Sequence, residues 1–148
     1  MKYTIEADID RPLEKVIALF PNPENYKYWQ TGLESIELIE GAPGATGARS
    51  RLKFKMGKKD MEIMETITLS NLPEVHTITY ESKLMRNIVK SEFSPIGQNK
   101  TKCVSHQELQ FKGFFRLMGL FFPGAFKKQS KKYLQDFKTF AESKATTD

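Results

Sequence analysis

A long amphipathic segment at the C-terminal end of the chain constrains the fold more than any other feature. Between Phe114 and Ala141, large apolar side chains recur every three or four residues, which is the spacing of one helix face. The stripe consists of Phe115, Met118, Phe122, Phe126, Ser130, Tyr133, Phe137 and Phe140. A helix with one apolar stripe needs an apolar surface to cover it, so the preceding part of the chain must supply that surface.

The first half of this predicted helix is apolar on more than one side. Phe114, Leu117, Leu120 and Phe121 lie outside the stripe, so several neighbours or an apolar substance other than protein must border them. The Pro-Gly pair at 123–124 predicts a kink or a break, because proline has no backbone N–H to donate within a helix.

The surface that receives the helix is predicted to be a seven-stranded antiparallel sheet. Short connections rich in Gly, Pro, Asn and Asp separate segments of strand-like sequence, as in consecutive hairpins. The predicted strands are Lys2–Asp10, Leu33–Glu40, Ala48–Met56, Met61–Leu69, Val75–Ser82, Met85–Phe93 and Thr101–Phe111. Two short helices are predicted after the first strand, one over Pro12–Phe20 and one that begins at Asn22. The fold class is therefore α+β.

Side-chain parity can be followed from hairpin to hairpin, and it divides the sheet into two faces. One face collects charged residues and threonines and is expected to contact water. The other face, which is expected to receive the helix, collects Leu52, Phe54, Met56, Met61, Ile63, Glu65, Ile67, Leu69, His76, Ile78, Tyr80, Ser82, Met85, Asn87, Val89, Ser91, Phe93, Thr101, Cys103, Ser105, Gln107, Leu109 and Phe111. One row across this face is predicted to contain Leu52, Glu65, Tyr80, Val89 and Ser105.

The face toward the helix carries more polar side chains than a close-packed core would hold, because each buried polar group needs a partner. Its middle contains Glu65, Tyr80, Asn87, Ser91, Ser105 and Gln107. A cavity that holds water or the polar end of a ligand would satisfy these groups. His76 lies near the rim and is interpreted as a loop-edge histidine that touches solvent.

Glu65 is the most informative of the polar residues, because burial should raise its pKa unless a donor such as Tyr80 compensates. Three interpretations are open. The carboxyl could be a structural group bonded to Tyr80 or water, a contact for the polar end of a ligand, or a general acid or base.

Trp29 follows the second predicted short helix. Together with Tyr26 it either closes the open end of the sheet or lines the mouth of a pocket. Cys103 has no basic neighbour on its predicted face, so a reactive thiol is not expected. Histidines and carboxylates do not converge in this pattern, so neither a metal site nor a cofactor is predicted.

Length, composition and net charge narrow the domain organisation, the compartment and the classes of partner that are expected. The 148 residues, with 39% hydrophobic and 28% charged residues, predict one domain over 1–148. The sequence has no apolar run long enough to span a bilayer and no apolar signal-peptide core, and its single cysteine agrees with a reducing compartment, so the cytoplasm is predicted. The net charge of +5 comes without a nucleic-acid-binding motif, so no nucleic-acid partner is predicted.

Four pieces of the sequence, taken with the order of elements, carry a family resemblance. They are IDRPLEKVIALF (9–20), PENYKYW (23–29), NLPEV (71–75) and TKCVSHQELQFKG (101–113). The chain resembles the START-like (SRPBCC) helix-grip superfamily, specifically its polyketide cyclase/dehydrase and lipid-transport group. The resemblance implies a curved sheet that grips the long helix, with an apolar cavity between them. It brings no catalytic motif that can be carried over residue by residue.

The sequence favours a ligand-binding protein over an enzyme. The leading hypothesis is binding or transport of a hydrophobic small molecule, lipid-like or polyketide-like, between the C-terminal helix and the sheet. The residues predicted to bind it are Trp29, Leu52, Phe54, Ile63, Glu65, Tyr80, Asn87, Val89, Ser105, Gln107, Leu117, Phe121 and Phe122. One alternative is a cyclase or dehydratase-type enzyme that uses Glu65. Another is a protein-interaction or chaperone-activator domain, in which Lys127–Lys132 or Phe114–Phe122 meets a partner or, transiently, a membrane surface.

Overall fold

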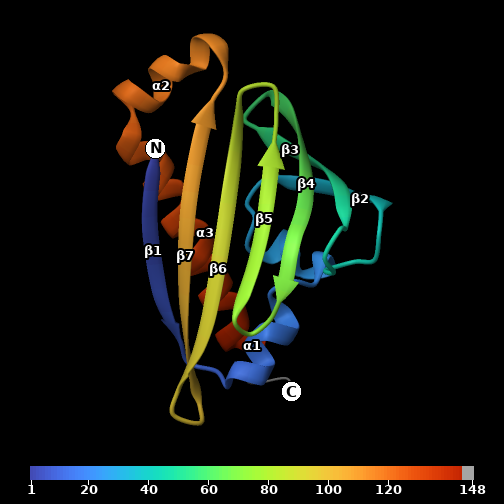
Figure 1. Cartoon of the computed structure of the whole chain (residues 1–148), viewed down its shortest axis with the longest axis vertical. Coiled ribbons are helices and arrows are strands. Elements are labelled where there is room, and N and C mark those ends of the chain that lie inside the picture. Colours follow the sequence, from blue (N-terminus) through green and yellow to red (C-terminus); the bar gives the residue numbers. More distant parts are fainter. Residues whose placement is uncertain (145–148) are drawn as a thin grey trace.

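The computed structural model describes residues 1–144, apart from the side chains at 56, 118 and 119, and its strands form a seven-stranded sheet (Figure 1). The strands are β1 (Lys2–Ile9), β2 (Leu33–Glu40), β3 (Arg49–Met56), β4 (Lys59–Asn71), β5 (Val75–Glu81), β6 (Met85–Ile96) and β7 (Lys100–Phe111). Their order across the sheet is β1-β7-β6-β5-β4-β3-β2, and each neighbouring pair is antiparallel. From β2 to β7, strands that follow each other in the sequence therefore also pair.

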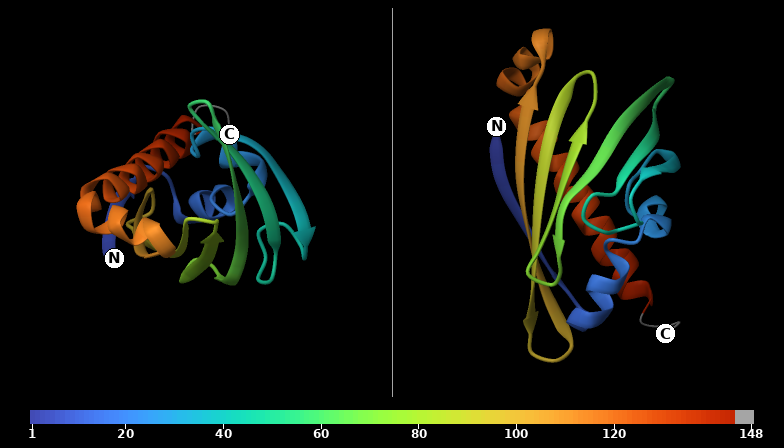
Figure 2. Two further views of the ribbon diagram at one scale, coloured as in Figure 1. Left: turned by 90° about the horizontal axis from the view of Figure 1, so that it is seen from above. Right: turned by 45° about the vertical axis from the view of Figure 1, so that its right-hand side comes forward.

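Helical elements stand on either side of the hairpin series in the sequence. The α-helix α1 (Leu13–Leu19) and the 3₁₀-helix η1 (Pro23–Tyr28) connect β1 to β2. The 3₁₀-helix η2 (Gly113–Phe115) and the α-helices α2 (Arg116–Phe121) and α3 (Pro123–Ser143) follow β7. Seen from above, the sheet curves around α3, with α1 and η1 inside the curve (Figure 2). The predicted α+β helix-grip fold is confirmed.

The core fills the end of the molecule where α1 and the C-terminal half of α3 meet the sheet. Ile9, Val16, Cys103 and Phe137 are fully buried there and belong to one hydrophobic cluster. They come from β1, α1, β7 and α3, so this cluster joins both ends of the chain to the sheet. Since apolar burial is the main favourable term in folding, this cluster is a main source of the stability.

The long C-terminal helix is divided in two, as the Pro-Gly pair predicted. Phe122, with φ −130° and ψ 47°, leaves the helical conformation, and Pro123 begins α3, where its missing N–H is harmless. α2 lies beside the end of β7 (Figure 1). Leu134, Phe137 and Phe140 on α3 are buried. No helix within residues 1–144 is long and apolar enough to cross a bilayer.

The row of residues predicted across the sheet is confirmed at the pair of Glu65 and Tyr80 and wrong at its other three pairs, although the prediction of which side chains share a face mostly survives. Leu52 pairs with Ile63 instead of Glu65, and Val89 pairs with Gln107. Both pairs differ from the predicted ones by two residues. A slip of two residues keeps every side chain on its face, which is why parity is the more robust prediction.

Leu69 is the clear exception to the predicted parity. The ladder between β4 and β5 has an irregularity between Ile67 and Leu69, after which Leu69 pairs with Thr77. An extra residue in one strand reverses the face of the side chains that follow it. Leu69 is therefore 46% exposed, and the prediction that it faces the helix is wrong.

Candidate ligand-binding cavity

A cavity of about 390 Å³ lies between α3 and the concave face of the sheet. This volume falls within the ~300–1,000 Å³ typical of small-molecule sites. Along α3 the cavity extends from Ala125 to Phe137, which corresponds to about 18 Å of helix axis. Its lining consists of Tyr3, Phe20, Trp29, Gln30, Phe54, Met61, Ile63, Ile78, Tyr80, Ser82, Met85, Asn87, Val89, Ser91, Cys103, Ser105, Gln107, Leu109, Ala125, Phe126, Gln129, Ser130, Tyr133, Leu134 and Phe137.

The described lining contains no aspartate, glutamate, lysine, arginine or histidine side chain. Aromatic and aliphatic groups dominate it, and its polar members are hydroxyls and amides. A charged ligand would lose its hydration here without gaining a counter-charge, which is strongly unfavourable. The cavity is therefore suited to an uncharged and largely apolar molecule.

A strip of neutral hydrogen-bonding groups crosses the floor of the cavity on β6 and β7. Asn87 Nδ2 donates to Gln107 Oε1 at 3.2 Å, and Gln107 Nε2 donates to Ser105 Oγ at 2.9 Å. Asn87 Oδ1 is buried without a partner, while the Ser105 hydroxyl keeps its own hydrogen to donate. The strip thus offers an acceptor at one end and a donor at the other.

Tyr3 fastens the opposite wall of the cavity to the edge of the sheet. Its hydroxyl lies 2.6 Å from Ser130 Oγ and donates to the Phe126 carbonyl at 3.2 Å. Ser130 is the one polar member of the apolar stripe, and this contact explains its presence. The first turns of α3 are held beside β1 by these bonds.

One end of the cavity is closed by packed aromatic rings. The ring of Trp29 lies 5.5 Å from that of Phe20 and 5.6 Å from that of Phe137, measured between centroids. The structure favours the closing role of Trp29 over the pocket mouth, although Trp29 lines the cavity. The Trp29 indole N–H and the Gln30 side-chain amide are buried without partners, so this end carries two unused donors.

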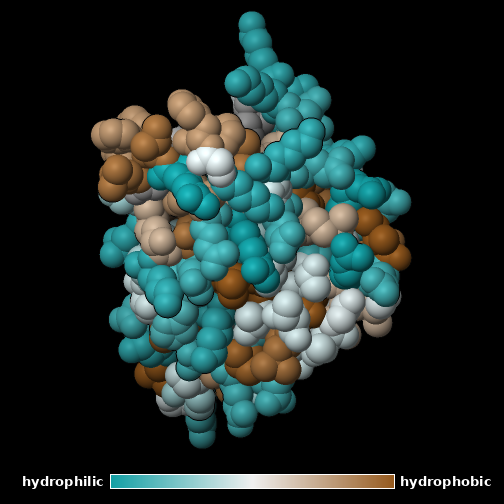
Figure 3. Space-filling view, turned by 45° about the horizontal axis from the view of Figure 1, so that its top comes forward, coloured by the Kyte–Doolittle hydropathy of each residue, from teal (hydrophilic) through white to brown (hydrophobic). Residues whose placement is uncertain are grey.

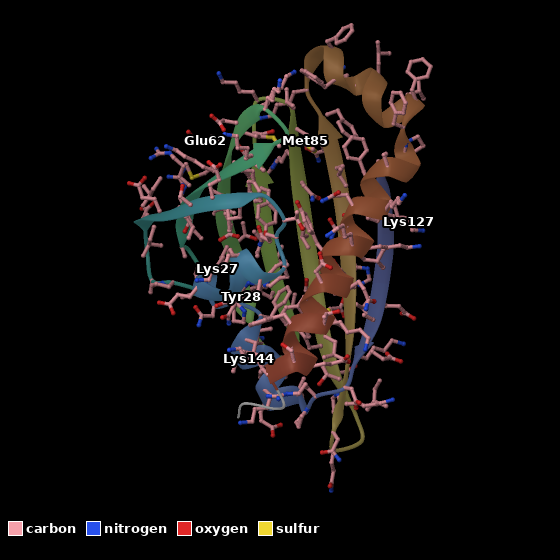
Figure 4. All side chains as sticks on the ribbon, turned by 180° about the vertical axis from the view of Figure 1, so that it is seen from behind. Lys27, Tyr28, Glu62, Met85, Lys127 and Lys144 are labelled. Atoms are coloured by element: carbon pink, nitrogen blue, oxygen red, sulfur yellow. The ribbon has the colours of Figure 1, made fainter. Side chains whose placement is uncertain are left out.

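The other end of the cavity is open. Ala125 and Gln129 on the first turns of α3 are exposed, and Met61 and Met85, where β4 and β6 begin, are partly exposed. Figure 4 shows Met85 at this end of the sheet. The break between α2 and α3 lies directly before Ala125, so the opening adjoins it.

Glu65 is buried beside the cavity and is not part of its lining. Tyr26 donates to Glu65 Oε1 at 3.3 Å, and Tyr80 is the cross-strand neighbour of Glu65. Burial raises the pKa of Glu65 to about 7, while hydrogen bonds from Tyr80 and Tyr26 act in the opposite direction. Because Tyr80 does line the cavity, its phenol is the group through which Glu65 could act on a ligand.

His76 is not the solvent-exposed histidine that its position near a strand end predicted. Its side chain is only 1% exposed, and its ring lies 5.8 Å from that of Phe20. Nδ1 pairs with Ser70 Oγ at 2.9 Å, whereas Nε2 is buried without a partner. Burial lowers the pKa of His76 to about 4, so the ring is neutral at physiological pH.

Two further groups bear on the chemistry of the site. Burial raises the pKa of the Cys103 thiol to about 12, so it is not a nucleophile at neutral pH. Across residues 1–144, no group of three or more His, Cys, Asp and Glu side chains is placed to hold a metal ion.

Comparison with known proteins identifies the family. Residues 1–142 match the family described as polyketide cyclase / dehydrase and lipid transport. The chain belongs to this family. No curated protein sequence matches the chain.

Solved structures place this family member among helix-grip folds. The Zhui aromatase/cyclase from a Streptomyces species aligns with a TM-score of 0.82 at 11% identity, over 98% of this chain and 95% of its own. A conserved protein from Geobacillus kaustophilus gives 0.81 at 12% identity, over 97% of both chains. Norcoclaurine synthase from Thalictrum flavum gives 0.69 at 14% identity, over 95% and 93%. At these identities the likeness shows the fold alone.

The structure brings most of the predicted site residues to the cavity of this family member. Those that line it are Trp29, Phe54, Ile63, Tyr80, Asn87, Val89, Ser105 and Gln107. Leu52 is fully buried in the core, and Glu65 is buried beside Tyr80 and is not part of the lining. Leu117, Phe121 and Phe122 are exposed on and after α2 and do not line the cavity, so their predicted place in its wall is corrected.

Several lining residues were not named as site residues from the sequence. Phe126, Ser130 and Tyr133 belong to the stripe of the C-terminal helix, and a serine within that stripe was the available signal. Phe20 reaches the cavity from the end of α1. The sequence carried no signal that Phe20 lines the cavity, because this depends on the position of α1 inside the curved sheet, which the sequence pattern does not give.

Proposed function

We propose that this protein binds an uncharged, elongated and mostly apolar small molecule in the cavity and acts as its carrier or sensor. The single observation that supports this most is a cavity of about 390 Å³ whose described lining contains no charged side chain. Apolar area removed from water would supply the affinity, and the few polar groups would fix orientation. Membership of a family that includes lipid transport agrees with this proposal.

The polar groups of the lining narrow the proposed ligand further. Asn87 Oδ1 can accept from a hydroxyl, and the unused donors on Trp29 and Gln30 can bind a carbonyl or ether oxygen at the closed end. A molecule with oxygens at separated positions along an apolar skeleton would satisfy them. The proposed place of action is the cytoplasm, with which the buried free thiol of Cys103 agrees.

Binding of Nile red, a neutral apolar dye, tests the proposal, together with mass spectrometry of molecules retained through gentle purification. Val89→Trp should fill the cavity and weaken dye binding by at least about tenfold, because it removes the apolar space that the dye occupies. Ile88→Trp is the matched control, since Ile88 precedes Val89 on β6 and lies on the opposite face. Absence of dye binding, or equal binding by both variants, would reject the proposal.

Acid–base catalysis on a bound polyketide-like molecule is a second candidate function. The observation that favours it is the carboxyl of Glu65, with a pKa of about 7, next to a tyrosine that lines the cavity. A group that titrates near neutral pH is suited to exchange protons during turnover. Glu65→Gln should then abolish turnover of an aromatic polyketide substrate and leave binding intact. Wild-type turnover by Glu65→Gln would exclude this function for Glu65.

A further inference from the structure

We propose that residues 112–132 form a docking surface for anionic lipid bilayers, placed beside the open end of the cavity. This docking surface consists of the apolar side chains of Phe114, Phe115, Leu117, Leu120, Phe121 and Phe122 and the basic side chains of Lys112, Arg116, Lys127, Lys128, Lys131 and Lys132. Docking does not require a filled cavity. Its use in exchanging ligand with the membrane rests on the proposed function.

The apolar part of the docking surface is unusually exposed for such large side chains. Phe114 is 80% exposed, Leu120 72% and Phe121 67%. Figure 3 shows them as a group of tan and brown residues gathered at the corner of the molecule that α2 occupies. An aromatic and aliphatic patch of this kind marks a surface that binds something apolar, because leaving it in water is unfavourable.

The whole net charge of the protein is located in the same stretch of sequence. Residues 112–136 contain six basic residues and one acidic residue, Asp136, so they carry +5. The remaining chain has 23 − 6 = 17 basic and 18 − 1 = 17 acidic residues and is neutral. Clustered basic residues next to apolar ones attract anionic lipid headgroups while the apolar side chains enter the interface.

Most of the basic side chains of the docking surface are available for a partner, although Lys112 donates to the Ser82 carbonyl. Lys127, Lys128 and Lys131 are exposed and form no ion pair within the described residues, whereas Lys132 pairs with Asp136 at 2.6 Å. α3 begins without an acidic residue in its first turn or a side-chain cap, so its positive dipole end adds to the field. Figure 4 shows Lys127 below α2, near the start of α3.

A bilayer fits this surface better than a second copy of the protein does. Two copies that met through it would bring two clusters of six basic residues together, and like charges oppose such contact. The surface also adjoins the cavity opening, since Ala125 and Gln129 line the cavity between α2 and Lys131. A docked protein would therefore present its opening to the lipid.

Vesicle cosedimentation of the full chain tests the proposal, with phosphatidylcholine vesicles that either contain or lack phosphatidylserine. The protein should bind the anionic vesicles, and raised salt should release it. Leu120→Glu should weaken binding by at least about tenfold. The matched control is Ile96→Glu, which adds the same charge at an exposed apolar residue of β6 near the opposite end of the sheet.

A second pair of variants measures the contribution of the basic side chains to vesicle binding separately from that of the apolar side chains. The triple variant Lys127→Gln, Lys128→Gln, Lys131→Gln should lose about fivefold in vesicle affinity for each charge removed. The matched triple variant Lys15→Gln, Lys90→Gln, Lys100→Gln removes three charges elsewhere and should bind as the wild type does. Equal losses in the two triple variants would overturn the proposal.

Five further outcomes are informative. No binding of wild type to anionic vesicles would overturn the proposal, as would binding that Leu120→Glu leaves unchanged. A dimer in solution that Leu120→Glu dissociates would assign the surface to self-association and would also overturn it. Nile red binding in vesicle-free buffer should be unaffected by Leu120→Glu. If the dye does not bind at all, the proposed function fails while the docking proposal still stands on the vesicle result.

Discussion

The closed and open ends of the cavity are both lined by α3, yet they differ in how closely the side chains pack. At the closed end, the ring of Phe137 lies 5.0 Å from that of Phe20 and 5.6 Å from that of Trp29. At the open end, Ala125 and Gln129 are exposed and face no comparable cluster. Close packing gives stability, and loose cover gives access. The difference shows that one helix can anchor the fold with its second half and border an open cavity with its first.

The largest expected effect is on stability at the closed end. Phe137→Ala should lower the free energy of unfolding by about 4 kcal/mol, because it leaves a cavity in a fully packed aromatic cluster. Phe126→Ala, on the same helix at the open end, should have a clearly smaller effect, since Phe126 is partly exposed. Urea unfolding followed by circular dichroism measures both, and equal losses would break the comparison.

Glu65 should make the protein less stable as the pH rises. Its pKa is about 7 in the folded state against an ordinary value of 4.5, so the folded state binds more protons between these values. Stability from this group is thus greatest below pH 4.5 and falls by on the order of 3 kcal/mol as the pH rises through 7. Glu65→Gln should remove this loss. Unfolding of wild type and variant at several pH values tests it, and parallel curves would contradict it.

His76, which packs at the closed end, should act in the opposite sense. Its pKa is about 4 in the folded state against 6.5, so the unfolded state binds more protons between these values. Stability from this group is present above pH 6.5 and falls by on the order of 3 kcal/mol as the pH drops to 4. His76→Gln should abolish the loss, measured in the same unfolding series. Glu65 and His76 oppose each other between pH 4.5 and 6.5, so the single variants are more informative than the wild type.

The smallest expected effect concerns the polar strip in the middle of the cavity. In wild type, a long-chain alcohol should displace Nile red at a lower concentration than the matching alkane does. Gln107→Leu should reduce the ratio of these two concentrations by about fivefold, because a hydrogen-bonding group is lost. The control is Gln110→Leu, an exposed glutamine later on β7. An unchanged ratio in Gln107→Leu would show that the strip serves the fold alone and does not select ligands.

Much of the fold could be predicted from two signals, the parity of side chains along the strands and the proline in the C-terminal helix. Parity survived a two-residue slip in pairing, as with Leu52 and Ile63, so Tyr80 and Ser105 were correctly placed on the helix face. The break at Pro123 followed from proline chemistry. Leu69 could not be predicted, because an irregular ladder depends on both strands at once.

The candidate site was less accessible to sequence reasoning than the fold. Parity places a residue on a face but does not tell whether its side chain reaches the cavity, so it could not tell that Glu65 is buried outside the lining while its neighbour Tyr80 lines it. Periodicity likewise shows which sides of a helix are apolar, but it does not show whether those sides face the sheet or the solvent. For that reason Leu117 and Phe121 were assigned to the inside, whereas the break after α2 turns them outward.

The single residue between α2 and α3 has a consequence for how such a protein can diversify. Phe122 ends the helical conformation between the short helix and the long one, and no described side chain of α2 lines the cavity, so substitutions in α2 are expected to leave the cavity lining unchanged. Under the two proposals above, the membrane surface that the protein prefers and the molecule that it binds would then be determined by adjacent but separate segments of one chain.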